Sequence, residues 1–289
     1  MSDFSIDLPK IPIGSFVSGI VDWIEGNLGW LLDGITLVLR YILNGFQDLL
    51  QLLPPELFIP ILAIIVYFVT RRDLKMALLS FAGLLLIWNL QLWNQAMMTL
   101  ALVISSTIVA LIIGVPLGIL AANNDSIHSV IRILLDFMQT MPSFVYLIPA
   151  VIFFSLGNVP GMIATVVFAM PPAIRLTNLG IRQIPRELIE VSDAFGATPR
   201  QKLIKVQLPV ALPTIMAGVN QCIMLALSMV VIASMIGAGG LGYQVLVGIQ
   251  RVDIAMGFEA GLAIVILAII LDRITQSLIT SGQKEADKR

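Results

Sequence analysis

Seven long apolar runs follow one another along the chain, and each is about as long as a helix must be to cross a bilayer. They lie at about 54–70, 75–93, 96–121, 131–156, 160–179, 210–235 and 259–279. Backbone N–H and C=O groups in lipid must find partners within their own segment, so runs of this length are predicted to be helices. The pattern therefore predicts an all-α, polytopic membrane protein with about seven transmembrane helices.

A different pattern precedes the first run. Between residues 11 and 52 the polar side chains recur in steps of three or four, which places them on one face of a helix. Trp23 and Trp30 are suited to the level of the lipid headgroups. We expect residues 1–53 to form an extracytoplasmic amphipathic arm of one or two helices that lies on the outer leaflet or braces the bundle. An eighth span is the alternative, which the charged residues of this segment disfavour.

The distribution of Lys and Arg between the loops indicates the orientation. Placing the loop after the first run inside the cell puts fourteen of the 17 basic residues on the inner side and three on the outer side. We therefore expect an outside N-terminus and a cytoplasmic C-terminus. The expected domains are the arm at 1–53, two peripheral helices at 54–93, a core at 94–280 and a cytoplasmic tail at 281–289.

Composition supports the membrane assignment and excludes several other classes. Hydrophobic residues make up 58% of the chain and charged residues 12%, with a mean hydropathy of +0.96; soluble domains have roughly 45–50% and 25%. The net charge of −1 argues against nucleic acid as a partner. One Cys and one His exclude a disulfide framework and a Cys/His metal cluster. The chain has no P-loop motif, so ATP is not expected to bind to it.

The longest polar stretch on the inner side lies between the fifth and sixth runs, and its residues 185–209 form what we call the knob. Gly196 suits the left-handed position that ends a helix, so a first helix is predicted over about 185–195. Thr198 is the predicted cap of a second helix, which is expected to continue to about Val206 and to be stopped by Pro209. Two short helices joined at a glycine would make a compact projection from the membrane.

The spacing within the knob is specific. Glu190, then Gly196 six residues later, then Pro209 resembles the E-A-A–x3–G–x9–I–x–L–P signature of permease subunits of binding-protein-dependent ABC importers. The match departs from that signature at its two alanines, which are Val191 and Ser192 here. The resemblance implies a type I ABC importer permease fold and implies that the knob forms coupling helices that dock in a cytoplasmic ATPase. The residues it assigns to this coupling are Glu190, Ser192, Asp193, Ala194, Phe195, Gly196, Lys205 and Pro209.

Three further stretches narrow the resemblance. Residues 136–154, 168–185 and 220–242 look like permeases for glycine betaine and proline betaine. That branch implies uptake of glycine betaine or a related osmoprotectant across the cytoplasmic membrane of a bacterium. It also implies a second copy of the permease, two ATPase subunits that hold ATP and Mg, and a separate extracytoplasmic binding protein. This chain itself is then expected to bind no cofactor and to catalyse no reaction.

Two alternatives stay open from the sequence. One is an ABC permease for another small solute, of the amino acid or choline/carnitine type. The other is an ion-coupled secondary transporter, which would be expected to place ionisable residues at mid-membrane. The middles of the predicted spans lack such residues, and a secondary transporter has no need of a docking element like the knob.

Candidates for the translocation path lie mainly in the fourth predicted span. A helix loosened by proline and lined by Met and aromatic side chains suits the passage of a cation that carries methyl groups. Ordinary bundle packing is the alternative for each of these residues. Asn220 is a main polar group of the sixth span and is a candidate too. The set is Met138, Met141, Pro142, Phe144, Tyr146 and Asn220.

Overall fold

The computed structural model describes residues 13–286, and every regular element within that range is a helix. In chain order the elements are α1 (Ile13–Gln51), α2 (Pro55–Val69), α3 (Leu74–Asn89), α4 (Trp93–Asn123), α5 (Asp125–Thr140), η1 (Ser143–Tyr146), α6 (Leu147–Phe154), α7 (Asn158–Arg182), α8 (Arg186–Ala194), α9 (Pro199–Lys202), η2 (Leu203–Gln207), α10 (Leu208–Ala233), η3 (Ser234–Ile236), α11 (Leu241–Arg251) and α12 (Ile254–Ala286). The predicted all-α class is confirmed over this range. Residues 1–12 of the predicted arm and 287–289 of the predicted tail lie outside it.

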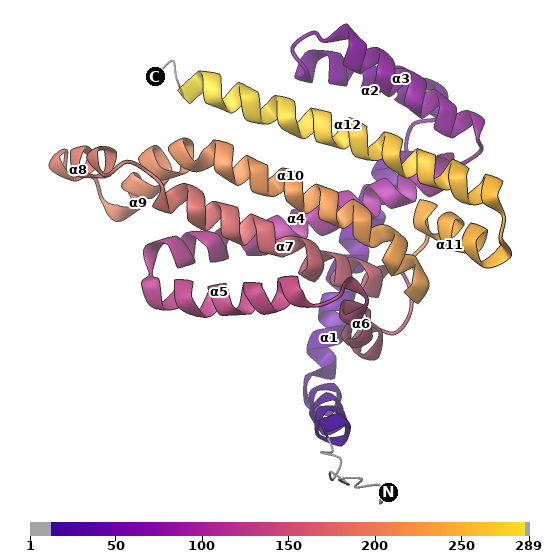
Figure 1. The fold of residues 1–289 in the computed structure, drawn as a ribbon, viewed down its shortest axis with the longest axis horizontal. Helices are drawn as coiled ribbons and strands as arrows, with labels where there is room; N and C mark the ends of the chain where they lie inside the picture. The colour runs from indigo at the N-terminus through magenta and orange to yellow at the C-terminus, as the bar shows by residue number, and fades with distance from the viewer. Residues whose placement is uncertain (1–12, 287–289) are drawn as a thin grey trace, which may run out of the picture.

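The centre of the bundle is α7, which packs against α4 on one side and α10 on the other. Figure 1 shows α7, α10 and α12 running alongside one another. Fully buried side chains from each layer meet in one cluster, among them Val103 of α4, Met162 of α7 and Val230 of α10. Burial of these apolar side chains against neighbouring helices holds the core together through close packing.

Two glycines allow α4 to approach α7. A Cβ atom at Gly118 would lie 2.6 Å from the Cβ atom of Thr177 and 2.7 Å from the carbonyl oxygen of Ile174. Gly114, one turn earlier, faces Ala173 in the same way at 3.2 Å. The G-x-x-x-G pattern therefore packs within this chain, where only glycine leaves room for the facing backbone.

The number of spans differs from the seven predicted. Among the described residues four helices are long and apolar enough to cross a membrane, and the number rises to six if each of two bent helix pairs is one span. The helices predicted as the first two spans are short, because α2 has 15 residues and α3 has 16, against about 20 for a full crossing. They form a hairpin at the edge of the bundle beside α12 (Figure 1).

The fourth predicted span, 131–156, is broken rather than continuous. Its two halves, Asp125–Thr140 and Ser143–Phe154, meet at a bend of 109°. Pro142 has no N–H to donate, and the residue before a proline is disfavoured in helical conformation; Met141 is accordingly extended, with φ −72° and ψ 133°. The expectation of one unbroken helix is wrong at this point, and we call the bend at Met141–Pro142 the elbow.

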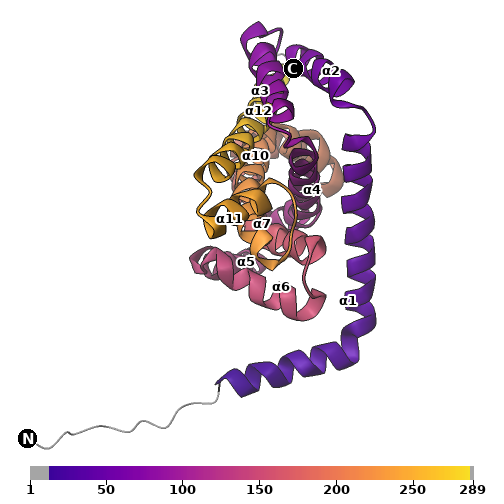
Figure 2. The ribbon, with the colours of Figure 1, turned by 90° about the vertical axis from the view of Figure 1, so that its right-hand side faces the viewer.

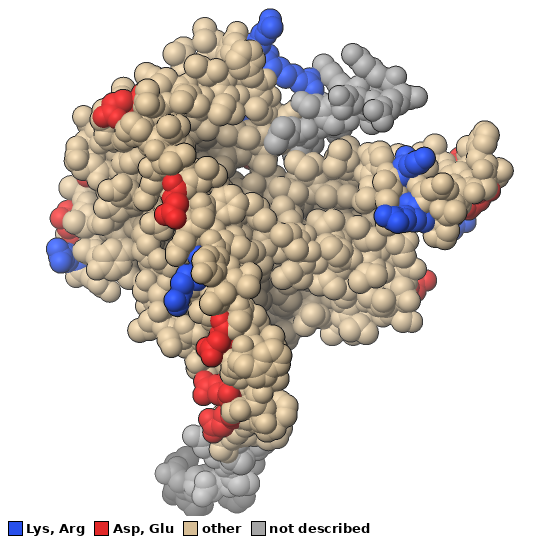
Figure 3. Space-filling model, turned by 180° about the vertical axis from the view of Figure 1, so that it is seen from behind, with Lys and Arg blue, Asp and Glu red and all other residues tan. Residues whose placement is uncertain are grey.

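The N-terminal arm is a long helix, α1, that crosses one side of the bundle (Figure 2). Leu39 and Leu43 are buried on the bundle side, where α1 packs mainly against α4. Figure 3 shows its charged side chains in a row on the outward face. The exposed charged residues of α1 are Asp22, Glu25, Asp33, Arg40 and Asp48. The prediction of an amphipathic arm is confirmed, and this arm braces the bundle.

Candidate coupling knob and translocation path

The first helix of the knob is α8, which begins after Pro185 and ends within a residue of its predicted limit. The N–H of Gly196 donates to the carbonyl oxygen of Asp193 at 2.9 Å, and the N–H of Ala197 donates to that of Ser192 at 3.0 Å. These two bonds are the Schellman motif, whose turn residue adopts a left-handed conformation. Gly196 has φ +72°, so the predicted role of this glycine as a helix stop is confirmed.

The second helix starts as predicted but does not end as predicted. The hydroxyl of Thr198 accepts from the N–H of Gln201 at 3.3 Å, and the Gln201 side chain accepts from the N–H of Thr198 at 2.9 Å, which is a capping box. The expectation that Pro209 stops the helix is wrong, because helical structure continues without a break over Pro199–Ile236. The π-helical segment η2 immediately before α10 widens the turn, which makes room for the proline ring.

The two helices of the knob are fastened to each other and to the bundle. Lys202 of α9 forms an ion pair with Asp193 of α8 at 2.5 Å. The hydroxyl of the buried Ser192 donates to the carbonyl oxygen of Ile189 at 2.7 Å. Ile189 also packs against a buried apolar cluster that α7 and α10 contribute to. The knob is therefore in packing contact with both α7 and α10.

An apolar stripe lies exposed on α8, at the end of the bundle (Figure 1). It consists of Leu188, Val191 and Phe195, whose spacing puts them on one helical face. Their exposed fractions are 42%, 53% and 88%. Apolar side chains that are exposed on a polar loop mark a surface for contact with another protein. Of the predicted coupling residues, Ser192 is buried and the exposed ones are Glu190, Asp193, Ala194, Phe195, Gly196, Lys205 and Pro209.

The structure brings some of the path candidates together at the elbow. Met138 is buried near the end of α5, and the hydroxyl of Tyr146 donates to its carbonyl oxygen across the bend. The ring of Tyr146 meets that of Phe168 edge-on, with centroids 5.8 Å apart, and Met141 packs in the same cluster. Phe144, in contrast, is half exposed. The elbow is thus a bend in which the aromatic ring of Tyr146 fastens the two halves.

Asn220 lies away from the elbow. Its amide donates to Asp272 at 3.0 Å, and its side-chain oxygen accepts from the hydroxyl of Thr275 at 2.8 Å. Both partners belong to α12, so these two hydrogen bonds join α10 to α12. The predicted role of Asn220 in the path stays a prediction, and its observed contacts are interhelical.

A polar network at the knob end of α5 and α7 was not anticipated. Arg182 donates to Asp125 at 2.7 Å and to Asn178 at 3.0 Å, and Asn178 in turn pairs with His128 at 2.7 Å. Arg175 forms a 2.8 Å ion pair with Asp136, closer than the 3.9 Å partner Arg132 on the same helix. Of these pairs, the sequence spacing could reveal only Arg132 with Asp136 and Arg182 with Asn178, because the other partners are far apart in the chain.

The described residues form an all-helical bundle with helices long enough to cross a membrane and a two-helix knob at one end, which is the architecture expected of a polytopic transport permease. Residues 114–280 match the family described as the binding-protein-dependent transport system inner membrane component. The chain belongs to this family, whose members are membrane subunits of ABC importers. Family membership decides against the ion-coupled secondary transporter.

Named relatives are similar over almost the whole chain. The glycine betaine/carnitine transport permease protein GbuB of Listeria monocytogenes is 53% identical, over 96% of this chain and 99% of its own length. The glycine betaine/proline betaine permease ProW of Escherichia coli is 50% identical, over 96% and 78%. The glycine betaine permease OpuAB of Bacillus subtilis is 48% identical, over 94% and 95%.

Solved structures agree on the fold. Two inward-facing structures of the MetNI methionine ABC transporter match with TM-scores of 0.60 and 0.61, each at 24% identity. The matches cover 64% and 66% of this chain, and 92% and 95% of the matched chains. The predicted ABC importer permease fold is thereby confirmed.

Proposed function

We propose that this chain is the membrane-spanning subunit through which an importer moves glycine betaine or a related compatible solute by alternating access. The substrate class is supported by the names of relatives that are 48–53% identical. One of these names also includes carnitine, so carnitine is the second substrate to test. The chain supplies the path and a separate ATPase supplies the driving force, with ATP and Mg bound to that partner.

The observation that supports the coupling role is the exposed apolar stripe, which lies on a knob whose two helices are held together by an ion pair. Leu188, Val191 and Phe195 offer contact area to a partner, while the ion pair between Asp193 and Lys202 keeps α8 and α9 together. Closure of two ATPases against two such knobs would move the attached helices as rigid bodies. We therefore propose an assembly of two permeases, two ATPases and a separate binding protein on the outer side.

Within the permease we propose the elbow as the moving part of the path. Pro142 leaves the chain without a helical hydrogen bond at the bend, so the angle between α5 and α6 can change once the hydrogen bond of Tyr146 to Met138 and its ring contact with Phe168 are released. Met141 and Tyr146 pack in one cluster there, and their soft and aromatic surfaces suit a methylated cation; Met138 contributes the carbonyl oxygen that Tyr146 donates to. Weak contacts are sufficient at such a place, since the solute must leave again.

Uptake in proteoliposomes tests the coupling role. The permease is reconstituted with its ATPase and binding protein, and ATP-dependent entry of labelled glycine betaine and carnitine is measured. Phe195→Asp should abolish uptake while leaving the fold intact, because Phe195 is 88% exposed. Val252→Asp, at an equally exposed site remote from the knob, is the matched control. Full uptake by the Phe195 variant would contradict the proposed docking surface.

Labelling from each side tests the orientation, for which we propose an outside N-terminus and a cytoplasmic C-terminus. The one native cysteine, Cys222, is buried, so the background should be low. Phe195→Cys should react with an impermeant maleimide only after the membrane is opened, and Val252→Cys should react in intact cells. The reverse pattern would overturn the orientation and leave the substrate assignment untouched.

A further inference from the structure

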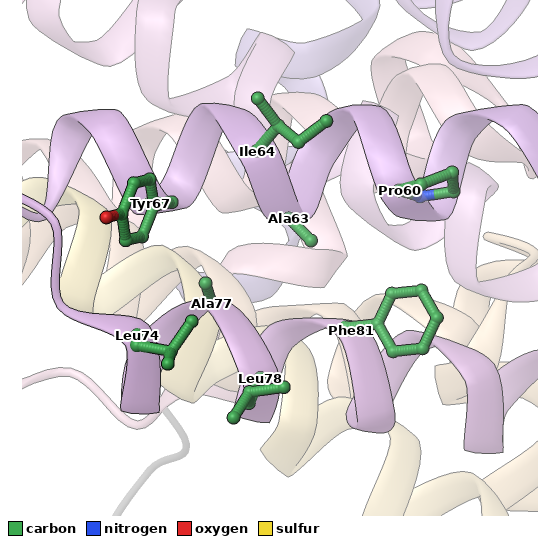
Figure 4. Close-up of a pocket in the computed structure, with 8 residues that line it drawn as sticks. All are labelled: Pro60, Ala63, Ile64, Tyr67, Leu74, Ala77, Leu78 and Phe81. Atoms are coloured by element: carbon green, nitrogen blue, oxygen red, sulfur yellow. The ribbon is translucent and has the colours of Figure 1, made fainter.

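An apolar groove runs between α2 and α3 at the edge of the bundle, with a volume of about 430 Å³ (Figure 4). Its floor is made by Ala63 and Ala77, which are buried, whereas Ile64 and Leu78 beside them are more than half exposed. The groove exists because two small side chains face each other between larger ones. The residues that line it are Pro60, Ala63, Ile64, Tyr67, Leu74, Ala77, Leu78 and Phe81.

A basic turn closes one end of this groove. The turn, residues 70–73, joins the end of α2 to the start of α3 and carries Arg71 and Arg72 against one acidic residue, Asp73; Lys75 follows in the first turn of α3. The Asp73 carboxylate accepts from the N–H of Lys75 at 2.9 Å, so it already serves as the cap of α3. The turn therefore offers excess positive charge at the end of a groove that is otherwise apolar.

The backbone of the turn holds Arg71 and Arg72 in a conformation that glycine usually adopts. The N–H of Arg71 donates to the carbonyl oxygen of Phe68 at 3.3 Å and that of Arg72 to Tyr67 at 2.7 Å, which is the same Schellman motif that ends α8. Arg71 has φ +58° and Arg72 has φ +67°. Glycine is the residue that such angles favour. Arginine at both places gives the turn two positive charges despite an unfavourable backbone.

We propose that the groove and the turn together bind one anionic phospholipid. An acyl chain lies in the groove on the floor of Ala63 and Ala77, and the phosphate of the headgroup meets Arg72 and Lys75. Basic residues at the membrane surface attract anionic lipids, and the lining of the groove is as apolar as a lipid tail. A helix from a second copy of this chain is the competing occupant of the groove, and the cross-link described below distinguishes it from a lipid. The site goes beyond the proposed function and holds in whichever leaflet the turn lies.

Native mass spectrometry of the assembled transporter tests the site. The complex is exchanged into mixed micelles that contain phosphatidylglycerol and phosphatidylcholine, and the lipids retained per permease are counted. The wild type should prefer phosphatidylglycerol. The double variant Arg72→Gly, Lys75→Gln should lose about fivefold of this preference for each charge removed, or about 25-fold for both. Glycine suits the φ of +67° at position 72 and Lys75 is exposed, so a failure of this variant to fold is not the expected outcome.

A second variant separates the tail from the headgroup. Ala77→Phe fills the floor of the groove and should abolish retention of both phosphatidylglycerol and phosphatidylcholine. Ala82→Phe, at an exposed position of α3 outside the lining, should leave the retention of both lipids unchanged. Arg251→Gln, an exposed charge on α11, is the control for loss of a positive charge elsewhere. Equal retention of the two lipids by the wild type would overturn the proposal. So would an unchanged preference in the double variant of Arg72 and Lys75, or a Leu78→Cys cross-link that joins two permease copies through the groove.

Discussion

Substitution of Gly196 isolates the contribution of backbone conformation to the stability of the knob. The residue has φ +72°, and no described atom lies within 4 Å of the place that a Cβ atom would occupy. Gly196→Ala therefore meets no obstacle, and its cost is the left-handed strain of an L-residue, about 1–2 kcal/mol. Gly196→Asn should cost less, because asparagine tolerates this conformation better than alanine does.

The strain acts on the two hydrogen bonds that end α8. A loss of about 1–2 kcal/mol makes opening of this cap about 5 to 30 times more frequent. Hydrogen exchange of the Gly196 and Ala197 amides in the reconstituted transporter should accelerate by that factor in the alanine variant. A knob that opens more often should also transmit less of each ATPase cycle, so solute uptake per ATP hydrolysed should fall.

A matched control uses a glycine with equal space and an ordinary helical backbone. At Gly261 of α12 an added Cβ atom would also have no described atom within 4 Å, but the φ of this residue is not positive. Gly261→Ala should therefore leave exchange and uptake unchanged or slightly improve stability. The reasoning fails if both alanine variants behave alike. It also fails if asparagine at position 196 is as harmful as alanine, since that would indicate a lost partner contact rather than strain.

Three other expectations follow from single contacts. Gly118→Leu should destabilise the bundle by about 3 kcal/mol or more, because a backbone carbonyl faces the glycine, while Gly114→Ala should cost less; thermal unfolding in detergent measures both. A double-mutant cycle of Asn220→Leu with Asp272→Leu should give a coupling energy of about 0.6–1.7 kcal/mol in the same assay. Thr198→Ala should cost about 1 kcal/mol, seen as faster hydrogen exchange at the start of α9.

For each of these three predictions, one experimental result would contradict the reasoning. Equal melting temperatures for the two glycine variants would show that α4 and α7 separate easily. A coupling energy near zero would mean that the polar clasp between α10 and α12 adds nothing to stability. Unchanged exchange in the Thr198 variant would show that the ion pair between Asp193 and Lys202 alone holds α9 in place.

Local signals in the sequence were sufficient to predict the knob. Gly196 and Thr198 each report on a few neighbouring residues, and the structure agrees with both. The end at Pro209 was mispredicted because a proline signals a stop only where the helix cannot widen, and the π-helical turn η2 widens it.

Structural features that depend on contacts between residues far apart in the chain could not be predicted from the sequence pattern. The 109° elbow is fixed by packing of Tyr146 and Phe168, although Pro142 marked its position. Arg182 finds Asp125 57 positions away in the chain, which no spacing rule for one helix can anticipate. The hydrophobic runs likewise identify apolar segments but do not say how many of them cross the bilayer in full.

The unbroken helix from the knob has a mechanical consequence. Pro199–Ile236 comprises 38 residues, or a shaft about 57 Å long at 1.5 Å per residue. A rotation applied at Lys202 would be transmitted along this helix as far as Gly237. The left-handed conformation of Gly237 is where the continuous helix ends. If the proposed motor grips the knob, its motion reaches the far tip through continuous helix, and the places where that helix bends most easily are the π-helical segment η2, Pro209 and Pro213.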